Sequence, residues 1–207
     1  MTMIARRYEL ERQIGRGSYG AVWIGRDHQL GRAVAVKLLH SDCLENPEAC
    51  SQFEHEAWAI AQLRSPHIVQ VYDAGIDDGQ PFIVMELLDG ESLEARLARH
   101  TKLPLSSVAR IVADIAKGLS ASHRIGIVHR DLKPANVFLA REQGRELAKL
   151  LDFGIASWIA PSDSNRQPSV TGDLAGTPQY MSPEQLCGVE VSRVADIWSL
   201  AVLAYEM

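Results

Sequence analysis

One short polar stretch, His-Arg-Asp-Leu-Lys-Pro-Ala-Asn at residues 129–136, constrains this chain more than any other. It lies between two short apolar runs and is therefore predicted to be a loop that joins two strands. The loop offers a carboxylate at Asp131, a cation at Lys133 and a carboxamide at Asn136, and a second carboxylate, Asp152, follows the next apolar run. A base, a cation and two oxygen ligands for a hard metal ion are what phosphoryl transfer requires of a protein. We therefore treat this stretch as the candidate reaction centre.

The composition excludes several classes of protein. A chain of 207 residues that is 46% hydrophobic can bury a core in one large domain or two small lobes. Its net charge of -5, with Lys and Arg scattered along the sequence, gives no electrostatic footprint for nucleic acid, so we expect no nucleic-acid partner. Three cysteines, Cys43, Cys50 and Cys187, lack paired metal-ligand spacing and are expected to be free thiols in a reducing compartment.

Neither end of the chain has the sequence pattern of a signal peptide or of a membrane-spanning helix. The first ten residues hold no apolar core of the length a signal peptide needs. The last apolar segment, residues 197–207, is far shorter than the roughly 20 residues of a membrane-spanning helix. We therefore expect a globular, cytoplasmic chain with no membrane segment of its own.

Residues 8–39 have the pattern of short strands separated by turns. A glycine-rich segment with Gly15, Gly17 and Gly20 interrupts two runs of alternating residues, which predicts a turn between two strands. Glycines let backbone amides approach a phosphate closely. A plain hairpin turn is the alternative for this motif taken alone, and a dinucleotide-binding fingerprint is disfavoured because a strand rather than a helix follows the glycines.

The next two elements carry a possible ion pair. Alternation along strand 33–39 puts Lys37 on a face with two alanines, which leaves room for a flat group, although an edge-strand lysine that deters aggregation is the alternative. From 46 or 47 to 63 the spacing is helical and places Glu56 on the apolar face. A carboxylate there needs a cation, and Lys37 is the candidate; otherwise Glu56 borders the core and stays solvated.

Two more strands are predicted at 68–72 and 81–88. The second is almost continuously apolar, as expected of a strand that is buried on both faces. An Asp-Gly pair at 89–90 follows and marks a boundary. The sequence thus predicts a mostly β part at 1–88 and a mostly α part at 89–207.

Helical periodicity dominates after this boundary. Residues 92–100 are predicted to form one helix. A second helix is predicted to begin at a cap on Ser106 or Ser107 and to end near His123, with an apolar stripe that faces the core.

Seven motifs in this order resemble a serine/threonine protein kinase, and the MSPEQ stretch with the general spacing resembles the bacterial branch of that family. They are IGRGSYGAV, AVAVK, the helix with Glu56, HRDLKPAN, DFG, GTPQYMSPE and DIWS, and they span residues 8–207. One such motif is a weak signal, but the ordered set is specific. The resemblance implies an α+β, two-lobed protein kinase-like fold: an N-lobe with an antiparallel sheet at 1–88 and a mainly α-helical C-lobe at 89–207. Because the family domain continues for several helices after DIWS, it also implies an incomplete C-lobe.

The resemblance implies an ATP site. The glycines Gly15, Gly17 and Gly20 would cover the phosphates, and Lys37, paired with Glu56, would hold two of them. The other implied positions surround the adenine: Ile14, Val22, Ala35, Met85, Glu86, Leu88 and Phe138.

The resemblance also implies the reaction, an ATP- and magnesium-dependent transfer of the γ-phosphoryl group to Ser or Thr hydroxyls of protein substrates, in signalling. Asp131 would accept or orient the hydroxyl proton, and Lys133 would neutralise the γ-phosphate. Asn136 and Asp152 would ligate Mg²⁺, and Thr177 would shape the acceptor site.

A regulatory segment is implied between DFG and SPE. Arg130 beside the catalytic carboxylate suggests control by phosphorylation, since a phosphate can order a loop against an arginine. By position the candidate phosphosites are Thr171 and then Ser169, and the alternative is an ordinary flexible loop.

Two other functions remain open from the residues. A chain without the last helices of the family domain is a candidate for a catalytically weak or inactive module that binds nucleotide or a partner. A small-molecule phosphotransferase of similar fold is disfavoured by GTPQYMSPE, which resembles a segment that docks protein substrates.

Overall fold

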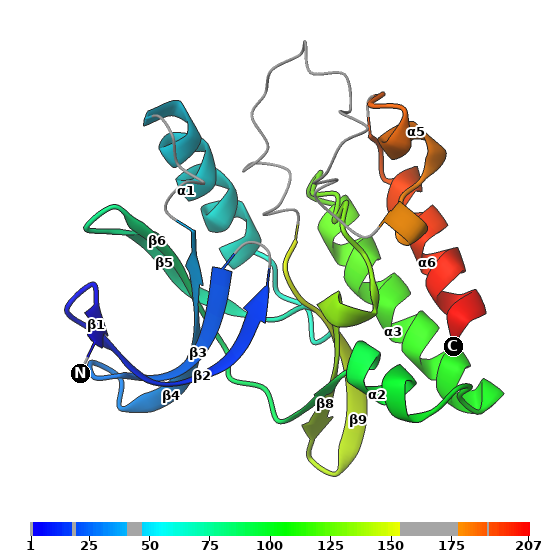
Figure 1. The fold of residues 1–207 in the computed structure, drawn as a ribbon, viewed down its shortest axis with the longest axis horizontal. Coiled ribbons are helices and arrows are strands. Elements are labelled where there is room, and N and C mark those ends of the chain that lie inside the picture. Colours follow the sequence, from blue (N-terminus) through cyan, green and yellow to red (C-terminus); the bar gives the residue numbers. More distant parts are fainter. Residues whose placement is uncertain (1, 18–19, 41–46, 154–177, 190) are drawn as a thin grey trace. The chain divides into compact units, whose positions relative to one another are not determined.

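The computed structural model describes residues 2–17, 20–40, 47–153, 178–189 and 191–207 (Figure 1). The chain divides into two compact units, each with its own core. The first unit is Met1–Arg64 with Val69–Leu88, and the second is Ser65–Ile68 with Asp89–Met207.

The first unit is an antiparallel sheet with one helix. The sheet has the order β1-β2-β3-β4-β6-β5, and helix α1 packs against β5 (Figure 1). The elements are β1 (Thr2–Ile4), β2 (Tyr8–Gly17), β3 (Gly20–Asp27), β4 (Arg32–Leu39), α1 (Pro47–Ala61), β5 (Val71–Asp77) and β6 (Gln80–Met85).

Strand β4 lies inside this sheet, between β3 and β6. Its valines Val34 and Val36 are fully buried in a cluster with Tyr8, Phe82 and Val84. The alternative of an edge-strand lysine at this place is therefore wrong, because both edges of the strand are paired.

Two strand boundaries differ from those expected. The strand predicted at 68–72 begins only at Val71, because Ile68 pairs instead with Leu150 and the His67 carbonyl accepts from the Leu150 amide (2.9 Å). The strand predicted to reach residue 88 ends at Met85. An apolar run predicts burial, but it does not reveal which segment supplies the backbone hydrogen bonds.

The second unit is mainly helical and carries a small sheet in the order β7-β8-β9 (Figure 1). Helix α3 packs against both β9 and α6. The elements are β7 (Gly90–Ser92), α2 (Leu93–Arg99), α3 (Leu105–His123), η2 (Pro134–Asn136), β8 (Val137–Glu142), β9 (Arg145–Leu150), η3 (Pro178–Tyr180), α5 (Pro183–Leu186) and α6 (Val194–Glu206).

The first two helices of this unit begin differently. Ser92 caps α2 by accepting a hydrogen bond from the Ala95 amide (3.1 Å), which confirms the helix predicted at 92–100. The predicted cap on Ser106 or Ser107 is wrong, because α3 begins one residue after Pro104 and both serines lie in its first turn. Proline suits this position, since it lacks the N–H that a helix start cannot satisfy.

Helix α3 supplies much of the core of the second unit. Ile111, Ile115 and Leu119, spaced by four residues, are almost completely buried. None of the helices in the described residues is both long and apolar enough to cross a membrane.

A buried carboxylate, Asp27, ties the start of β2 to the end of β3. Arg7 donates to both its oxygens (2.8 and 2.7 Å), and the amides of Gln29 and Leu30 donate to one of them (3.0 and 3.2 Å). The hydrogen bonds from the Arg7 guanidinium lower the pKa of Asp27 from 3.8 to about 2. The ionised carboxylate thus stabilises the folded state.

We expect Asp27→Asn to lower the free energy of unfolding by about 2 kcal/mol at neutral pH, because the Arg7 pair loses its charge. A lowered pKa stabilises the fold above the unfolded value of 3.8 and ceases to do so as the pH falls through about 2. The difference between wild type and variant, measured by chemical denaturation, should therefore shrink from pH 4 towards pH 2.

The control is Glu11→Gln, which removes a solvent-exposed pair with Arg26 and should cost less than about 0.5 kcal/mol. A pH-independent difference for Asp27→Asn would contradict the role given to its charge.

Candidate active site

The segment around residues 129–136 is only partly the loop that the sequence predicts. Strand β8 follows it directly, but residues 127–130 are not a strand, and a 3-10 turn (η2) forms its end. Asp196 of α6 holds the start of this segment, because its two carboxylate oxygens accept hydrogen bonds from the backbone amides of His129 (2.9 Å) and Arg130 (2.8 Å). Arg130 has a φ of 64°, in the left-handed region, and these bonds fix it there.

The three predicted polar residues of this segment come together in one cluster. Lys133 donates to both carboxylate oxygens of Asp131 (2.8 and 3.1 Å), and the amide nitrogen of Asn136 donates to one of them (3.0 Å). The same amide nitrogen also donates to the backbone carbonyl of Asp131 (2.8 Å). Asp131 is thereby held in a fixed orientation beside a cation, as a general base requires.

These bonds also fix how Asn136 can bind a cation. Its amide nitrogen faces Asp131, so its amide oxygen points elsewhere and is the atom that a hard metal ion prefers. No cluster of three or more His, Cys, Asp or Glu side chains suited to a metal occurs in the part of the chain that the structure describes. Two oxygen ligands with waters and phosphates in the other positions fit Mg²⁺.

The second predicted metal ligand, Asp152, follows a segment that is tied to the same loop. The amide of Leu151 donates to the carbonyl of Asn136 (2.9 Å), and a ring nitrogen of His129 lies 2.9 Å from the carbonyl of Leu151. The ring of Phe153 packs on His129, with centroids 4.7 Å apart. Asp152 has a φ of 50°, so its backbone turns sharply between two anchored neighbours.

Asp196 is the functional residue that sequence reasoning missed. It is 1% exposed and also lies 2.7 Å from a ring nitrogen of His123 on α3. A buried carboxylate needs donors, and here two backbone amides and an imidazole supply them. The available signal was an aspartate in the first turn of an otherwise apolar helix, within the DIWS motif.

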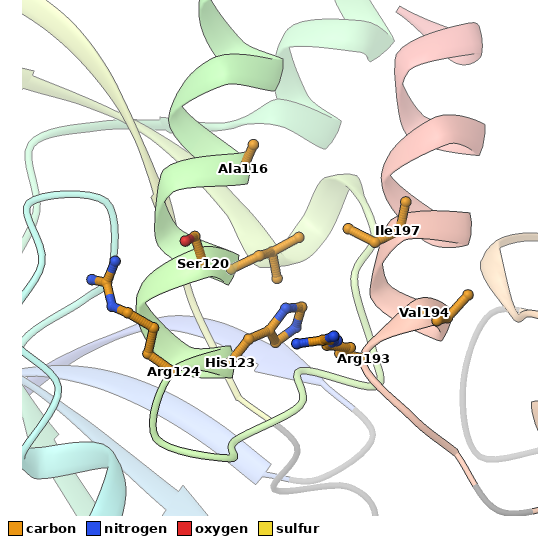
Figure 2. A pocket seen from close by; sticks show the side chains of 8 residues that line it. Ala116, Ser120, His123, Arg124, Arg193, Val194 and Ile197 are labelled. Carbon is orange, nitrogen blue, oxygen red and sulfur yellow. The ribbon is translucent and has the colours of Figure 1, made fainter.

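A pocket of about 400 Å³ opens beside His123, between α3 and α6 (Figure 2). Figure 2 shows the side chains of His123 and Arg193 pointing toward one another, while Arg124 points away from α6. Ile197 and Val194 form the α6 side of the pocket. The lining contains no carboxylate and none of the cluster around Asp131, so we assign this pocket no part in the chemistry.

The predicted ATP-binding glycines lie where β2 turns into β3. Gly17 pairs with Gly20 and Gly15 with Val22. A Cβ on Gly20 would lie 1.9 Å from the carbonyl oxygen of Leu38, so only glycine fits there. A Cβ on Gly17 would meet nothing within 4 Å, so packing within the unit does not require glycine at that position.

The other predicted residues of the first unit lie on the middle strands. Lys37 is 7% exposed on β4, between Val22 of β3 and Ile83 of β6. Ala35, on the same strand, is paired with Met85. Ala35 and Met85 are both buried, so Lys37 is the polar residue of this part of β4.

The segment after β6 is tied to Gln70. The amide of Glu86 donates to the carbonyl of Gln70 (3.0 Å), and the side-chain carboxylate of Glu86 accepts from the Gln70 amide (2.8 Å). Ile14 is 45% exposed, whereas Leu88 and Val22 are partly buried. In the second unit Phe138 is partly buried on β8.

Several predicted positions lie outside the described residues. They are Gly154, Ser169, Thr171, Thr177 and the side chain of Glu56, although the backbone of Glu56 is part of α1.

An antiparallel sheet followed by a helical unit that carries Asp131, Lys133 and Asn136 on one loop defines the class of protein kinase folds. The family model of the protein kinase domain matches residues 8–207. The chain belongs to the protein kinase domain family, as the sequence motifs indicated.

Individual relatives agree with this membership. The chain is 43% identical over 205 residues to a probable serine/threonine-protein kinase of Streptomyces coelicolor, covering 97% of this chain and 30% of that protein. It is 39% identical over 201 residues to the serine/threonine-protein kinase Pkn1 of Myxococcus xanthus, covering 97% of this chain and 28% of that protein. The chain thus spans less than a third of the length of these two relatives.

The fold agrees with solved structures. The PknI kinase domain of Mycobacterium tuberculosis superposes with a TM-score of 0.79 at 31% identity, over 99% of this chain and 72% of that chain. The predicted α+β, two-lobed kinase-like fold is confirmed.

We expect Asp196→Asn to loosen the catalytic loop, because asparagine has one acceptor oxygen where the carboxylate serves two backbone amides and His123. Amide hydrogen exchange at His129 and Arg130, followed by mass spectrometry or NMR, should become about tenfold faster or more.

The matched control is Ile197→Ala, the next residue of α6, which is 53% exposed and leaves these bonds intact. Unchanged protection of both amides in Asp196→Asn would show that the carboxylate does not hold the loop.

Proposed function

We propose that this chain is the catalytic part of an ATP- and magnesium-dependent protein kinase that phosphorylates Ser or Thr hydroxyls in signalling. The observation that carries the proposal is the geometry around the Asp131 carboxylate. Its oxygens accept hydrogen bonds from the amine of Lys133 (2.8 and 3.1 Å) and from the amide nitrogen of Asn136 (3.0 Å). The names of the relatives, serine/threonine-protein kinases, support this acceptor class.

Asp131 acts on the acceptor. Its carboxylate accepts the proton of the attacking hydroxyl, or orients that hydroxyl toward the phosphorus. Lys133, 2.8 Å away, offsets the carboxylate charge and has further N–H donors for the transferred phosphoryl oxygens. A carboxylate and an ammonium on one short segment thus serve the two reacting groups.

Asn136 and Asp152 are the residues that would hold Mg²⁺. The hydrogen bond from the Leu151 amide to the Asn136 carbonyl keeps Asn136 close to Asp152, the residue that follows Leu151. The bound metal would supply positive charge for the phosphate oxygens.

In the first unit, the glycine-rich turn and β4 serve the nucleotide. A Cβ on Gly17 would meet nothing within 4 Å, and this space supports a close approach of phosphates to the backbone amides. Lys37, nearly buried, would bind phosphate oxygens and pair with Glu56. The remaining adenine positions are those predicted from the sequence, with the carbonyl of Glu86 and the backbone of Leu88 as hydrogen-bonding groups. In this proposal residues 1–88 hold the nucleotide and residues 89–207 hold the acceptor.

We expect Asp131→Asn to lower the rate of phosphoryl transfer to Ser/Thr peptides by a factor of about a thousand, because the amide is not a base. ATP binding should persist, since the carboxamide preserves the shape. Saturating Mg-ATP at a hundred times its dissociation constant should stabilise both proteins by about 2.7 kcal/mol in thermal melts.

The control is Asp78→Asn, the same change on an exposed turn between β5 and β6, where φ is 48° and asparagine is tolerated. Equal transfer by Asp131→Asn would end the assignment of Asp131. Stabilisation by nucleotide without transfer by the wild type would favour the alternative of a nucleotide-binding module.

We propose that Thr177 shapes the acceptor site. We expect the activity to depend also on phosphorylation of the segment before it. Mass spectrometry of active protein is expected to find phosphate on Thr171 or Ser169, because a phosphate supplies the anion that orders such a loop against an arginine. Thr171→Ala should lower the activity, and Ser162→Ala, in the same segment, is the control. An unphosphorylated active protein, with full activity in Thr171→Ala, would refute this regulation.

A further inference from the structure

The backbone carbonyl of Arg130, in the peptide group that leads into Asp131, is bound by a side chain of helix α5. The amide nitrogen of the Gln185 side chain donates to this carbonyl over 2.7 Å, although the two residues are 55 positions apart in the sequence. Both residues belong to the second unit, in which α5 follows the turn η3. A distant side chain thus reaches the backbone immediately before the proposed base.

The other end of the same side-chain amide is held by Ser182, the N-cap of α5. The amide oxygen of Gln185 accepts from the backbone N–H of Ser182 (3.0 Å) and from its hydroxyl (3.1 Å). This is the capping-box arrangement, in which the third helical residue reaches back to the cap, and Ser182 is completely buried. The reverse orientation of the amide would set its oxygen against the carbonyl of Arg130, so the two partners together fix it.

Both polar atoms of the peptide group between Arg130 and Asp131 have partners. Its carbonyl accepts from Gln185 (2.7 Å), and its N–H donates to the carbonyl of His129 (2.9 Å). The preceding peptide group is held at the N–H of Arg130, which donates to Asp196 (2.8 Å). Because the φ of Arg130 is 64°, these two peptide planes meet at a sharp left-handed turn, and their orientation sets the direction of the next side chain, Asp131.

Two helices therefore share the support of this turn. Asp196 of α6 is buried and holds the amide side of Arg130, whereas Gln185 of α5 holds the carbonyl side at an exposed position. Water competes for an exposed carbonyl, so this bond adds little to the overall stability of the fold. It depends instead on the anchoring of Gln185, which the two hydrogen bonds from Ser182 supply. The role that remains for the bond is to set the geometry of the turn.

We propose that Gln185 is a positioning residue for Asp131 and acts on it through the carbonyl of Arg130. The inference rests on the proposed function and adds to it a link between the base and the segment 178–186, which begins directly after Thr177. Glutamine suits this role because its amide accepts from Ser182 and donates to Arg130 at the same time. An ionised glutamate could serve Ser182 but has no donor for the carbonyl.

The test is Gln185→Glu, which keeps the capping box but sets a carboxylate oxygen against the carbonyl of Arg130. We expect kcat for transfer to a Ser/Thr peptide to fall about tenfold or more, because a small displacement of a reacting group costs at least that much. The KM for ATP and the stabilisation by Mg-ATP in thermal melts should stay at the wild-type values. Gln185→Met, which has a similar size and no polar group, should show the same fall. The control is Gln143→Glu, the same change on the exposed turn between β8 and β9.

A double-mutant cycle shows whether Gln185 acts through Asp131. In the background of Asp131→Asn the base is already absent, so Gln185→Glu should lower the residual kcat by less than about twofold. A loss as large as that in the wild-type background would mean that Gln185 acts on another part of the site, and it would overturn the proposal. A wild-type kcat in both Gln185→Glu and Gln185→Met would overturn it as well.

Amide hydrogen exchange separates a failure of this link from a failure of the proposed function. If the wild type phosphorylates no peptide, the proposed function fails, and the link is tested by exchange alone. In Gln185→Glu the amide of Asp131 should exchange about tenfold faster, because its peptide group is free to rotate, whereas the amides of His129 and Arg130 stay protected by Asp196. Equal protection of the Asp131 amide in the wild type and in Gln185→Glu overturns the proposal.

Discussion

The buried carboxylate of Asp196 is the interaction on which the catalytic loop depends. Its two oxygens receive the amides of His129 and Arg130 and the ring of His123, which belong to two different segments far away in the sequence. An ionised group that is 1% exposed would be very costly without these donors, so the loop and the aspartate require one another. These two bonds hold the backbone at His129 and Arg130, and so they maintain the left-handed conformation of Arg130.

The same face of α6 extends this support to the turn η3. Asp196, Ser199 and Glu206 are spaced by three and seven residues, so they lie on one side of the helix. Ser199 donates to the carbonyl of Tyr180, and Glu206 accepts from its hydroxyl. One helix thus fixes both the loop that carries Asp131 and the turn η3. A shift of α6 would therefore change both together.

The sequence alone was sufficient to predict the contacts of site residues where those contacts are local. Asp131, Lys133 and Asn136 lie within six residues, so their motif already implies their contacts, and the strand and helix order follows from periodicity. It was insufficient where the partner is distant. Asp196 bonds to residues more than sixty positions away, and Ile68 leaves its expected strand to pair with Leu150. Ser106 and Ser107 failed as caps because Pro104 starts the helix without them.

The glycine-rich turn shows why a motif does not assign one cause to all its members. Gly20 is required by the fold, because any side chain would collide with the carbonyl of Leu38 on the neighbouring strand and its φ is 152°. Gly17 meets neither condition, since a Cβ there would face open space. Nothing in the described part of the chain requires glycine at Gly17, and in the proposed function a phosphate that approaches the backbone closely would supply that requirement. Gly20 thus belongs to the part of the motif that builds the hairpin, and Gly17 to the part that the proposal gives to the nucleotide.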